Sequence, residues 1–447
     1  MSTQTNVDRP APFVFDRTGV EQYLAFGFNP DVDDPDPLAV LSEWSRNPRG
    51  DLAGMSERAL VREGTRALRA AVAQCVEGTA TIGGDQVVFL SGGLDSRTIL
   101  GALLEIFDTS QIIAVTFGMP GEQDFDDAAC VAKAAGVRHE TLQTAGVEWT
   151  TQGLVDSILA RRLPLPFPFG QRYVSYLLHE RLGPQNVFWD GLCGDIVSGK
   201  LFRPGCEAWD WGTSVADFLA KHLAVGRDRL YSAQFDPGTS IQAEPFCSTD
   251  DLACYYQLMY GIRQRHYVST RVLRDYPTCT PFLAGPWLDV MLRIPVRHRL
   301  GQRLYEEIQK AAFPRLFALP TTAHDGGAVL ESRLARSARN LRWRVEHESA
   351  RRSLTLLAGT SHEPGANAAI RAGLRCSGGA RELAVENLTD LAARGIIDWV
   401  DVESYIPGIA AEQASDAALT RLLGLELNLK AAEQVAATTV PESPVDP

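Results

Sequence analysis

The sequence predicts an α/β fold, a doubly wound parallel sheet with helices on both faces, joined to a mostly helical C-terminal part. Four short segments have the length and composition of strands: residues 86–90, 111–117, 139–142 and 186–190. The apolar runs among them indicate burial on both faces, which is typical of parallel sheets. Between these strands the apolar residues recur at the spacing of a helix, and this helical pattern dominates the sequence beyond residue 200.

Helices are expected between and after these strands, at residues 97–105, 128–136, 154–162 and 174–182. Residues 56–76 also keep a helical period, with Ser56 as the N-cap. Proline and aspartate predict loops at the N-terminus, with room for a short helix around 20–26. We therefore divide the chain into a loop-rich segment (1–50), an α/β domain (51–325), a helical region (326–435) and a disordered tail (436–447).

The chain has 447 residues and a formal net charge of −12, and this acidic balance argues against a nucleic-acid-binding protein. No apolar stretch approaches the roughly 20 residues that span a bilayer. Met1–Thr5 has neither the basic nor the apolar part of a signal peptide. The eight cysteines form no C-x-x-C pair, so we expect neither a zinc site nor a disulfide framework. These features predict a cytoplasmic protein that binds no membrane.

The helical region contains one local exception to the acidic balance. Arg333, Arg336, Arg339 and Arg342 recur every three residues and form a ridge along one side of a helix. This ridge is either a solvated face paired with nearby glutamates or a docking site for an acidic partner or a phosphate-bearing carrier.

A glycine-rich turn, Ser91–Ser96 (SGGLDS), joins the first predicted strand to the following helix. Strand, glycine turn and helix aim free backbone N–H groups and the positive end of a helix dipole at an anion. Serine hydroxyls add donors, and Asp95 can hold a divalent cation on the same oxygens. The turn differs from the G-K-[ST] and G-x-G-x-x-G phosphate loops. It predicts a polyphosphate cradle, the alternative being a glycine turn without a ligand.

A second glycine turn, Asp190–Asp195 (DGLCGD), follows the strand at 186–190. The carboxyl ends of parallel strands meet at one edge of a sheet, so the two turns are expected side by side. Asp195 would then join Asp95 as a second carboxylate on a magnesium ion that bridges phosphates. Taken alone, the second turn could be an ordinary glycine turn.

The SGGLDS turn resembles the pyrophosphate-binding loop of the N-type ATP pyrophosphatases. Together with further segments in the same order, it resembles the synthetase domain of the asparagine synthetase family, which includes β-lactam synthetases and lasso-peptide cyclases. These segments are Thr116–Gly118, Asp124 with the helix after it and His139, Asp190–Asp195, Thr280–Leu283 and Arg303–Pro314. The resemblance covers about residues 50–325.

This resemblance implies that the chain binds ATP with Mg²⁺ and splits ATP between the α and β phosphates. It assigns pyrophosphate binding to Ser91, Gly92, Gly93, Asp95 and Ser96, and it counts Leu94 among the nucleotide-binding residues. The strand end at Leu90 is expected on the adenosine side. The resemblance places adenosine beside Thr116, Phe117 and Gly191, and the metal on Asp95 and Asp195.

Three departures from the family pattern matter. The family's glutaminase domain has no counterpart in the residues before the synthetase-like part, so we expect no glutamine hydrolysis. Leu192 occupies the family's acidic position in the second turn, and Ile196 replaces a glutamate after Asp195. The lysine of the family's K-x-x-L-R helix falls on Arg303.

Arg303 and Lys310 are candidates for the cation that stabilises transition-state charge, because seven residues apart they share a helix face. Arginine cannot deprotonate an amine. A general base would therefore come from Glu306, Tyr305 or a second substrate carboxylate. Alternatively, Arg303 and Lys310 are surface charges of an exposed helix.

The resemblance implies an ATP-dependent, AMP-forming amide ligase, a carbon–nitrogen ligase that adenylates a carboxylate and couples it to an amine. Its partners would be a small-molecule or peptide carboxylate and an amine supplied by the substrate, as in the biosynthesis of a modified peptide or another specialised metabolite. Three alternatives stay open: a ligase that takes ammonia from a separate glutaminase, a tRNA- or base-modifying pyrophosphatase, and a nucleotide-binding regulator without catalysis.

Overall fold

The computed structural model describes most of the chain. The described residues are 15–30, 52–161, 170–200, 202–224, 226–249, 252–264, 273–324, 327–328, 379–411 and 416–439. The arginine ridge at Arg333–Arg342 and the last residues of the expected tail lie outside them.

A parallel sheet of five strands, in the order β3-β2-β1-β4-β5, organises the described residues. The strands are β1 (Gln86–Phe89), β2 (Ile112–Gly118), β3 (Arg138–Gln143), β4 (Val187–Trp189) and β5 (Thr278–Cys279). The first four confirm the predicted strands. The fifth escaped prediction because it has two residues and a proline lies close on each side, which hides any apolar period.

Helices cover both faces of this sheet, which confirms the doubly wound α/β fold. On one face Val88, Ala114 and Trp189 share a core with α3 (Glu57–Gly78), α4 (Asp95–Leu103) and α5 (Gln123–Ala135). On the other face Val87, Val115 and Phe188 pack near Leu182 of α7. The helices on that side are α6 (Thr151–Leu159) and α7 (Gly170–Leu182).

The strand order creates a switch point between β1 and β4. From β1 the chain proceeds through β2 to β3 on one side, and it then returns to β4 on the other side. Ligands of open α/β sheets bind outside the carboxyl ends of the strands at such a point. The predicted turns Ser91–Ser96 and Asp190–Asp195 follow these two strands.

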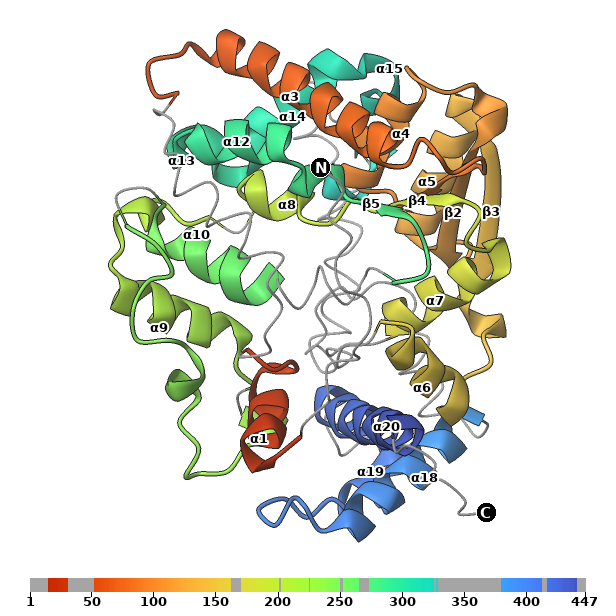
Figure 1. Ribbon diagram of the computed structural model, residues 1–447, viewed down its shortest axis with the longest axis vertical. Helices are drawn as coiled ribbons and strands as arrows, with labels where there is room; N and C mark the ends of the chain where they lie inside the picture. Colours follow the sequence, from red (N-terminus) through yellow and green to blue (C-terminus); the bar gives the residue numbers. More distant parts are fainter. Residues whose placement is uncertain are drawn as a thin grey trace, which may run out of the picture.

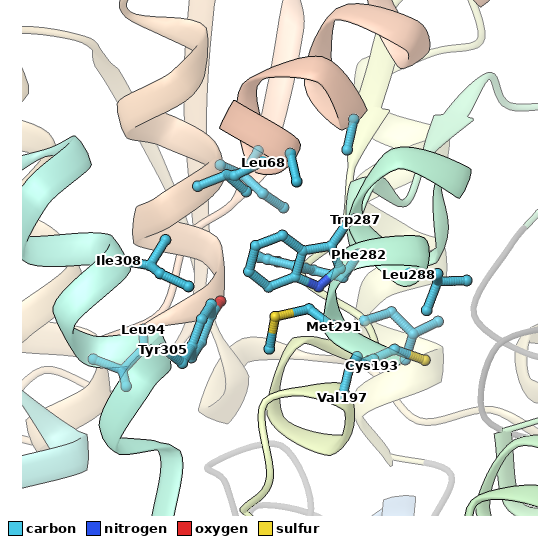
Figure 2. Close-up of a cluster of buried hydrophobic side chains, with 14 of the residues drawn as sticks. Leu68, Leu94, Cys193, Val197, Phe282, Trp287, Leu288, Met291, Tyr305 and Ile308 are labelled. Atoms are coloured by element: carbon cyan, nitrogen blue, oxygen red, sulfur yellow. The ribbon is translucent and has the colours of Figure 1, made fainter. Parts of the chain in front are cut away.

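A layer of helices from distant parts of the chain packs above the sheet (Figure 1). Helices α12 (Gly285–Arg293) and α14 (Arg303–Ala312) lie against α3. Their contact surface is aromatic and sulfur-rich, and Trp287, Met291 and Tyr305 point toward one another in it (Figure 2). This layer brings α14 next to the turn after β1.

Short elements complete this half of the molecule. The helices are α8 (Gly194–Val197), α9 (Trp211–His222), α10 (Cys254–Leu258) with a π-helix at Met259–Gln264, α13 (Val296–Arg299) and α15 (Pro314–Phe317). A small antiparallel pair of strands consists of β6 (Pro320–Thr321) and β7 (Gly327–Ala328).

Helices from the N-terminal and C-terminal parts of the chain meet in a second core. It combines α1 (Arg17–Phe26) and α6 with α18 (Gly379–Arg394), α19 (Tyr405–Ala411) and α20 (Asp416–Thr439), drawn in blue in Figure 1. The Arg421 guanidinium donates to the carbonyls of Leu24 and Ala25 at 2.7 and 3.2 Å. Helix α1 of the N-terminal segment and helices α18 to α20 of the helical region, which lie far apart in the sequence, therefore pack together.

Helix α20 is the centre of this second core. All residues from Ala418 to Asn428 are buried, so neighbours cover the helix on every side. Charged residues interrupt it, and none of the described helices is both long and apolar enough to cross a membrane.

A buried ion network joins α18 to α20. Arg394 forms two hydrogen bonds to Glu426, at 2.6 and 2.9 Å, and also binds Glu433. The Glu426 side chain is fully buried, and its burial raises its pKa, while Arg394 and Lys430 oppose that effect. Lys430 lies 3.9 Å from Glu426 and donates to Asp390. Removing Arg394 would therefore leave a buried carboxylate without its main partner.

We predict that Arg394→Met lowers the free energy of unfolding by about 3 kcal/mol near pH 8. The loss of the arginine raises the folded-state pKa of Glu426 further. This raised pKa destabilises the native state only at pH values where Glu426 is ionised, so the loss of stability becomes smaller toward about pH 5. Urea unfolding at both pH values measures it. Arg66→Met, which removes the exposed pair with Glu63, is the control and changes stability by about 0.5 kcal/mol or less. Equal losses in the two variants would contradict the role of Arg394.

Candidate functional site

The two glycine turns contact each other at the carboxyl ends of β1 and β4. A Cβ atom on Gly191 would lie 2.9 Å from the Cβ of Asp95, and one on Gly194 would lie 2.6 Å from its Oδ1. Real Cβ atoms do not approach other atoms so closely, so both positions require glycine while Asp95 keeps its place. The expected juxtaposition of the turns is therefore present, with Asp95 at its centre.

Serine hydroxyls fix the shape of the first turn. The Ser91 N–H donates to Ser96 Oγ at 3.0 Å, and the two hydroxyls lie 3.1 Å apart. The Gly93 N–H in turn donates to Ser91 Oγ at 3.2 Å. Because Ser96 is buried, its hydroxyl closes the turn, whereas Ser91 is half-buried and open to a ligand.

Helix α4 begins directly at this turn without a capping side chain. Leu94 is its N-cap, and the first bond of the helix is from the Thr98 N–H to the Leu94 carbonyl at 3.0 Å. The N–H groups of the first helical turn therefore have no partner within the helix. Together with the helix dipole they form a binding site for an anion.

Four residues form hydrogen bonds with the backbone of Gly92. Its N–H donates to Asp124 at 3.0 Å, and burial raises the pKa of that carboxyl. Its carbonyl accepts from Arg97, from Thr321 Oγ1 at 2.7 Å and from the Thr322 N–H at 3.1 Å. Asp124 belongs to the predicted family pattern, but the sequence analysis missed the other three residues.

Among the residues that hold Gly92, Arg97 forms the most extensive set of hydrogen bonds. Its side chain is fully buried and donates to the carbonyls of Gly92, Leu316, Leu319 and Pro320. It thereby joins the first turn to the segment that follows α14. Only its place directly after SGGLDS, on a helix expected to be apolar on one face, signals this role in the sequence.

Two carboxylates meet where the turns touch. Burial, and secondly the negative charge of Asp195, raise the pKa of Asp95 to about 7. Asp195 is the second residue of α8, and its carboxylate lies 3.8 Å from the Lys200 ammonium. Such a pair of acids, held close without a strong cation between them, favours a bound cation.

Tyr305 of α14 supports this pair from the core. Its hydroxyl donates to Asp95 Oδ1 at 2.8 Å, and its side chain is fully buried (Figure 2). Burial, and then the charge of Asp95, hold the pKa of Tyr305 well above its usual range. The structure therefore assigns Tyr305 to positioning Asp95, an arrangement that does not support the expected role of general base.

The described residues fit a magnesium ion that also binds phosphate. Asp95 and Asp195 supply two carboxylates, and no cluster of three or more metal-ligating side chains exists among the described residues. Mg²⁺ commonly takes one or two carboxylates and completes its shell with water and phosphate oxygens. The donor set is therefore that of a shared metal–phosphate site.

The structure places Arg303 and Lys310 away from these turns. Arg303 pairs with Glu57 at 3.3 Å, and both side chains are largely exposed. Lys310 pairs with Glu307 at 2.8 Å. At 3.6 residues per turn, both cations lie on the side of α14 nearly opposite Tyr305. Each cation is thus paired with a glutamate, and the expected role of the two residues at the transition state stays a prediction.

Glu306 lies one residue beyond Tyr305, about 100° around the helix from the side that meets Asp95. Its role as general base stays a prediction.

Thr116, one of the residues expected beside adenosine, forms hydrogen bonds within the sheet. Thr116 is buried, and its hydroxyl donates to the Leu90 carbonyl at 2.8 Å and lies 2.9 Å from His139 Nε2. Burial lowers the pKa of His139, which favours the neutral ring. Thr116 and His139 thus tie β1, β2 and β3 together, and Phe117, half-buried at the end of β2, stays the candidate for a ligand contact.

The departures in the second turn have structural counterparts. Leu192 is buried in the main core, so its position is apolar as well as uncharged. Cys193 has a φ of 72°, a left-handed conformation that glycine adopts most easily.

The sheet order and the paired turns define this part of the chain as an α/β nucleotide-binding domain. Residues 63–216 match the family model for asparagine synthase, and this span includes both turns. This match assigns residues 63–216 to the synthetase domain of the asparagine synthetase family, a family of ATP-dependent ligases that form amides. No match was found among curated proteins.

We predict that Asp95→Asn stabilises the ligand-free protein at high pH. The folded-state pKa of about 7 exceeds the unfolded value of about 3.9, so ionised Asp95 destabilises the native state increasingly between these pH values. The melting temperature of the variant should exceed that of the wild type near pH 8 and approach it near pH 4. Calorimetric scans across this range measure it, and a constant difference would contradict the assignment.

We predict that Gly194→Ala weakens binding of ATP with Mg²⁺ by roughly 100-fold, because the new methyl group displaces Asp95. Titration calorimetry measures the affinity. Gly78→Ala is the matched control, since a Cβ there meets nothing within 4 Å, and it should bind like the wild type. Wild-type affinity in Gly194→Ala would show that the turns need not touch.

Proposed function

We propose that this protein is an AMP-forming amide ligase, which activates a carboxylate as an acyl-adenylate and joins it to an amine. The observation that supports this proposal best is the convergence of both turns on Asp95, directly beside the uncapped start of α4. A site that combines backbone donors with two carboxylates suits a polyphosphate and its metal better than a single phosphate.

In the first step, a carboxylate oxygen of the substrate attacks the α-phosphorus of ATP. The bond to the oxygen bridging to the β-phosphorus breaks, and pyrophosphate leaves with that electron pair. We assign the leaving group to the uncapped start of α4, whose backbone N–H groups have no partner within the helix, and to the half-buried Ser91 hydroxyl beside it. The ties of Gly92 to Asp124, Arg97 and Thr321 hold these donors in place before the reaction.

In the second step, the amine nitrogen attacks the acyl carbon, the bond to AMP breaks, and the nitrogen loses a proton. The buried Leu192 provides no carboxylate for that proton, and Tyr305 is committed to Asp95. We therefore assign the base to a substrate carboxylate or to water, and we propose that the substrate itself supplies the amine. This arrangement suits a modified peptide or another specialised metabolite.

Asp95 and Asp195 would hold the magnesium ion, and Tyr305 orients Asp95 for this purpose. When bound, the ion neutralises phosphate charge and polarises the phosphoryl oxygens.

The products of ATP consumption test this proposal. The wild type should release AMP and pyrophosphate in the presence of its acid, and exchange of labelled pyrophosphate into ATP should identify that acid from a panel. Asp95→Ala and Asp195→Ala should each lower the exchange rate by about 100-fold or more. Asp85→Ala, at the amino end of β1, is the control and should exchange at the wild-type rate.

Formation of ADP and orthophosphate would refute the proposal. Binding of ATP without exchange for any acid, with or without ammonium, would favour a nucleotide-binding regulator instead. Amide formation with ammonium as the preferred amine would favour a partner protein that supplies ammonia.

A further inference from the structure

The site contains more negative than positive charge. Asp95 and Asp195 lie together, Asp124 adjoins the first turn, and the proposed ligand is itself highly anionic. Phosphoryl-transfer sites commonly offset such charge with lysine or arginine. A cation that can reach the phosphates is therefore expected close to the two turns.

The arginines near the turns are committed to other partners. Arg97 donates to four backbone carbonyls and lies over the ring of Phe317. Arg299 is buried, donates to the Val197 carbonyl and to Tyr256, and lies between two aromatic rings. Neither side chain can turn to a ligand without breaking buried bonds.

Lys200 differs from both arginines. It follows α8 at the edge of the carboxylate pair, and its Nζ lies 3.8 Å from Asp195 Oδ2, which is beyond hydrogen-bond distance. The side chain is 60% exposed, so little holds it in that position. Its charge also acts on Asp95 and opposes the effects that raise the pKa of that carboxyl.

The backbone of Lys200, in contrast, is fixed. Its N–H donates to the Asp195 carbonyl at 3.0 Å, and the preceding Gly199 has a φ of 101° and packs against the backbone of Arg299. Because the backbone is fixed and the ammonium is only loosely held, the Lys200 side chain can turn toward a ligand without any change in the backbone.

We propose that Lys200 binds the pyrophosphate portion of ATP and of the departing product. This inference rests on the proposed function and adds a residue to it. The ammonium would exchange its weak contact with Asp195 for hydrogen bonds to phosphate oxygens, to which lysine binds as a point charge. It would thus take the role of the fixed cation that the sequence led us to seek at Arg303 and Lys310.

Titration calorimetry with three probes tests the proposal: ATP with Mg²⁺, inorganic pyrophosphate with Mg²⁺, and AMP. Lys200→Met should weaken binding of ATP and of pyrophosphate by roughly 10- to 100-fold, the loss expected for a hydrogen bond to a charged group. Binding of AMP should change by less than about 2-fold. Lys200→Arg should recover most of the affinity for pyrophosphate, because it keeps the charge.

Lys133→Met is the matched control, since Lys133 is exposed at the far end of α5, and it should bind all three probes like the wild type. Unchanged affinity of Lys200→Met for pyrophosphate would overturn the inference. An equal loss for AMP would also overturn it, because Lys200 would then merely maintain the turn. If the wild type binds neither ATP nor pyrophosphate, the proposed function itself fails.

Discussion

The close approach of Gly191 and Gly194 to Asp95 is the constraint on which the site depends. Two strands that are neighbours in the sheet but about a hundred residues apart in sequence end in turns that share this one carboxylate. A Cβ atom at Gly191 or Gly194 would collide with Asp95, so the geometry of one turn determines that of the other. The anion-binding start of α4 and the carboxylate of Asp195 acquire a common ligand only because this contact exists.

A single stretch of chain, from Arg299 to Thr322, supports both turns from behind. Arg299 and Gln302 hold the residues after α8, Tyr305 and Gln309 hold the start of α4, and Thr321 and Thr322 hold Gly92. Each contact comes from a buried or half-buried polar group. The segment therefore supports the turns through directional hydrogen bonds as well as through apolar packing. The site is therefore assembled by a segment outside the matched family span of 63–216.

Local sequence patterns predicted the parts of the site whose chemistry and position are set by neighbours in the chain. A strand, a glycine turn and a helix start are all visible in SGGLDS and its flanks. The face that a helix turns toward the site is set by packing, and α14 shows the difference: the pattern drew attention to Arg303 and Lys310, whereas Trp287 and Met291 orient the helix so that Tyr305 meets Asp95. The short segment Pro320–Thr322 has no periodicity at all, and its contact with Gly92 follows from tertiary structure alone.

The burial of α20 on every side has a consequence for how the chain matures in the cell. The bonds from Arg421 to Leu24 and Ala25 span almost 400 residues of sequence. During translation α1 and α6 emerge from the ribosome long before the helix that fills the space between them. The apolar faces of these early helices stay open to solvent or to chaperones until α20 has been synthesised, so this half of the molecule closes later than the parts that precede α20.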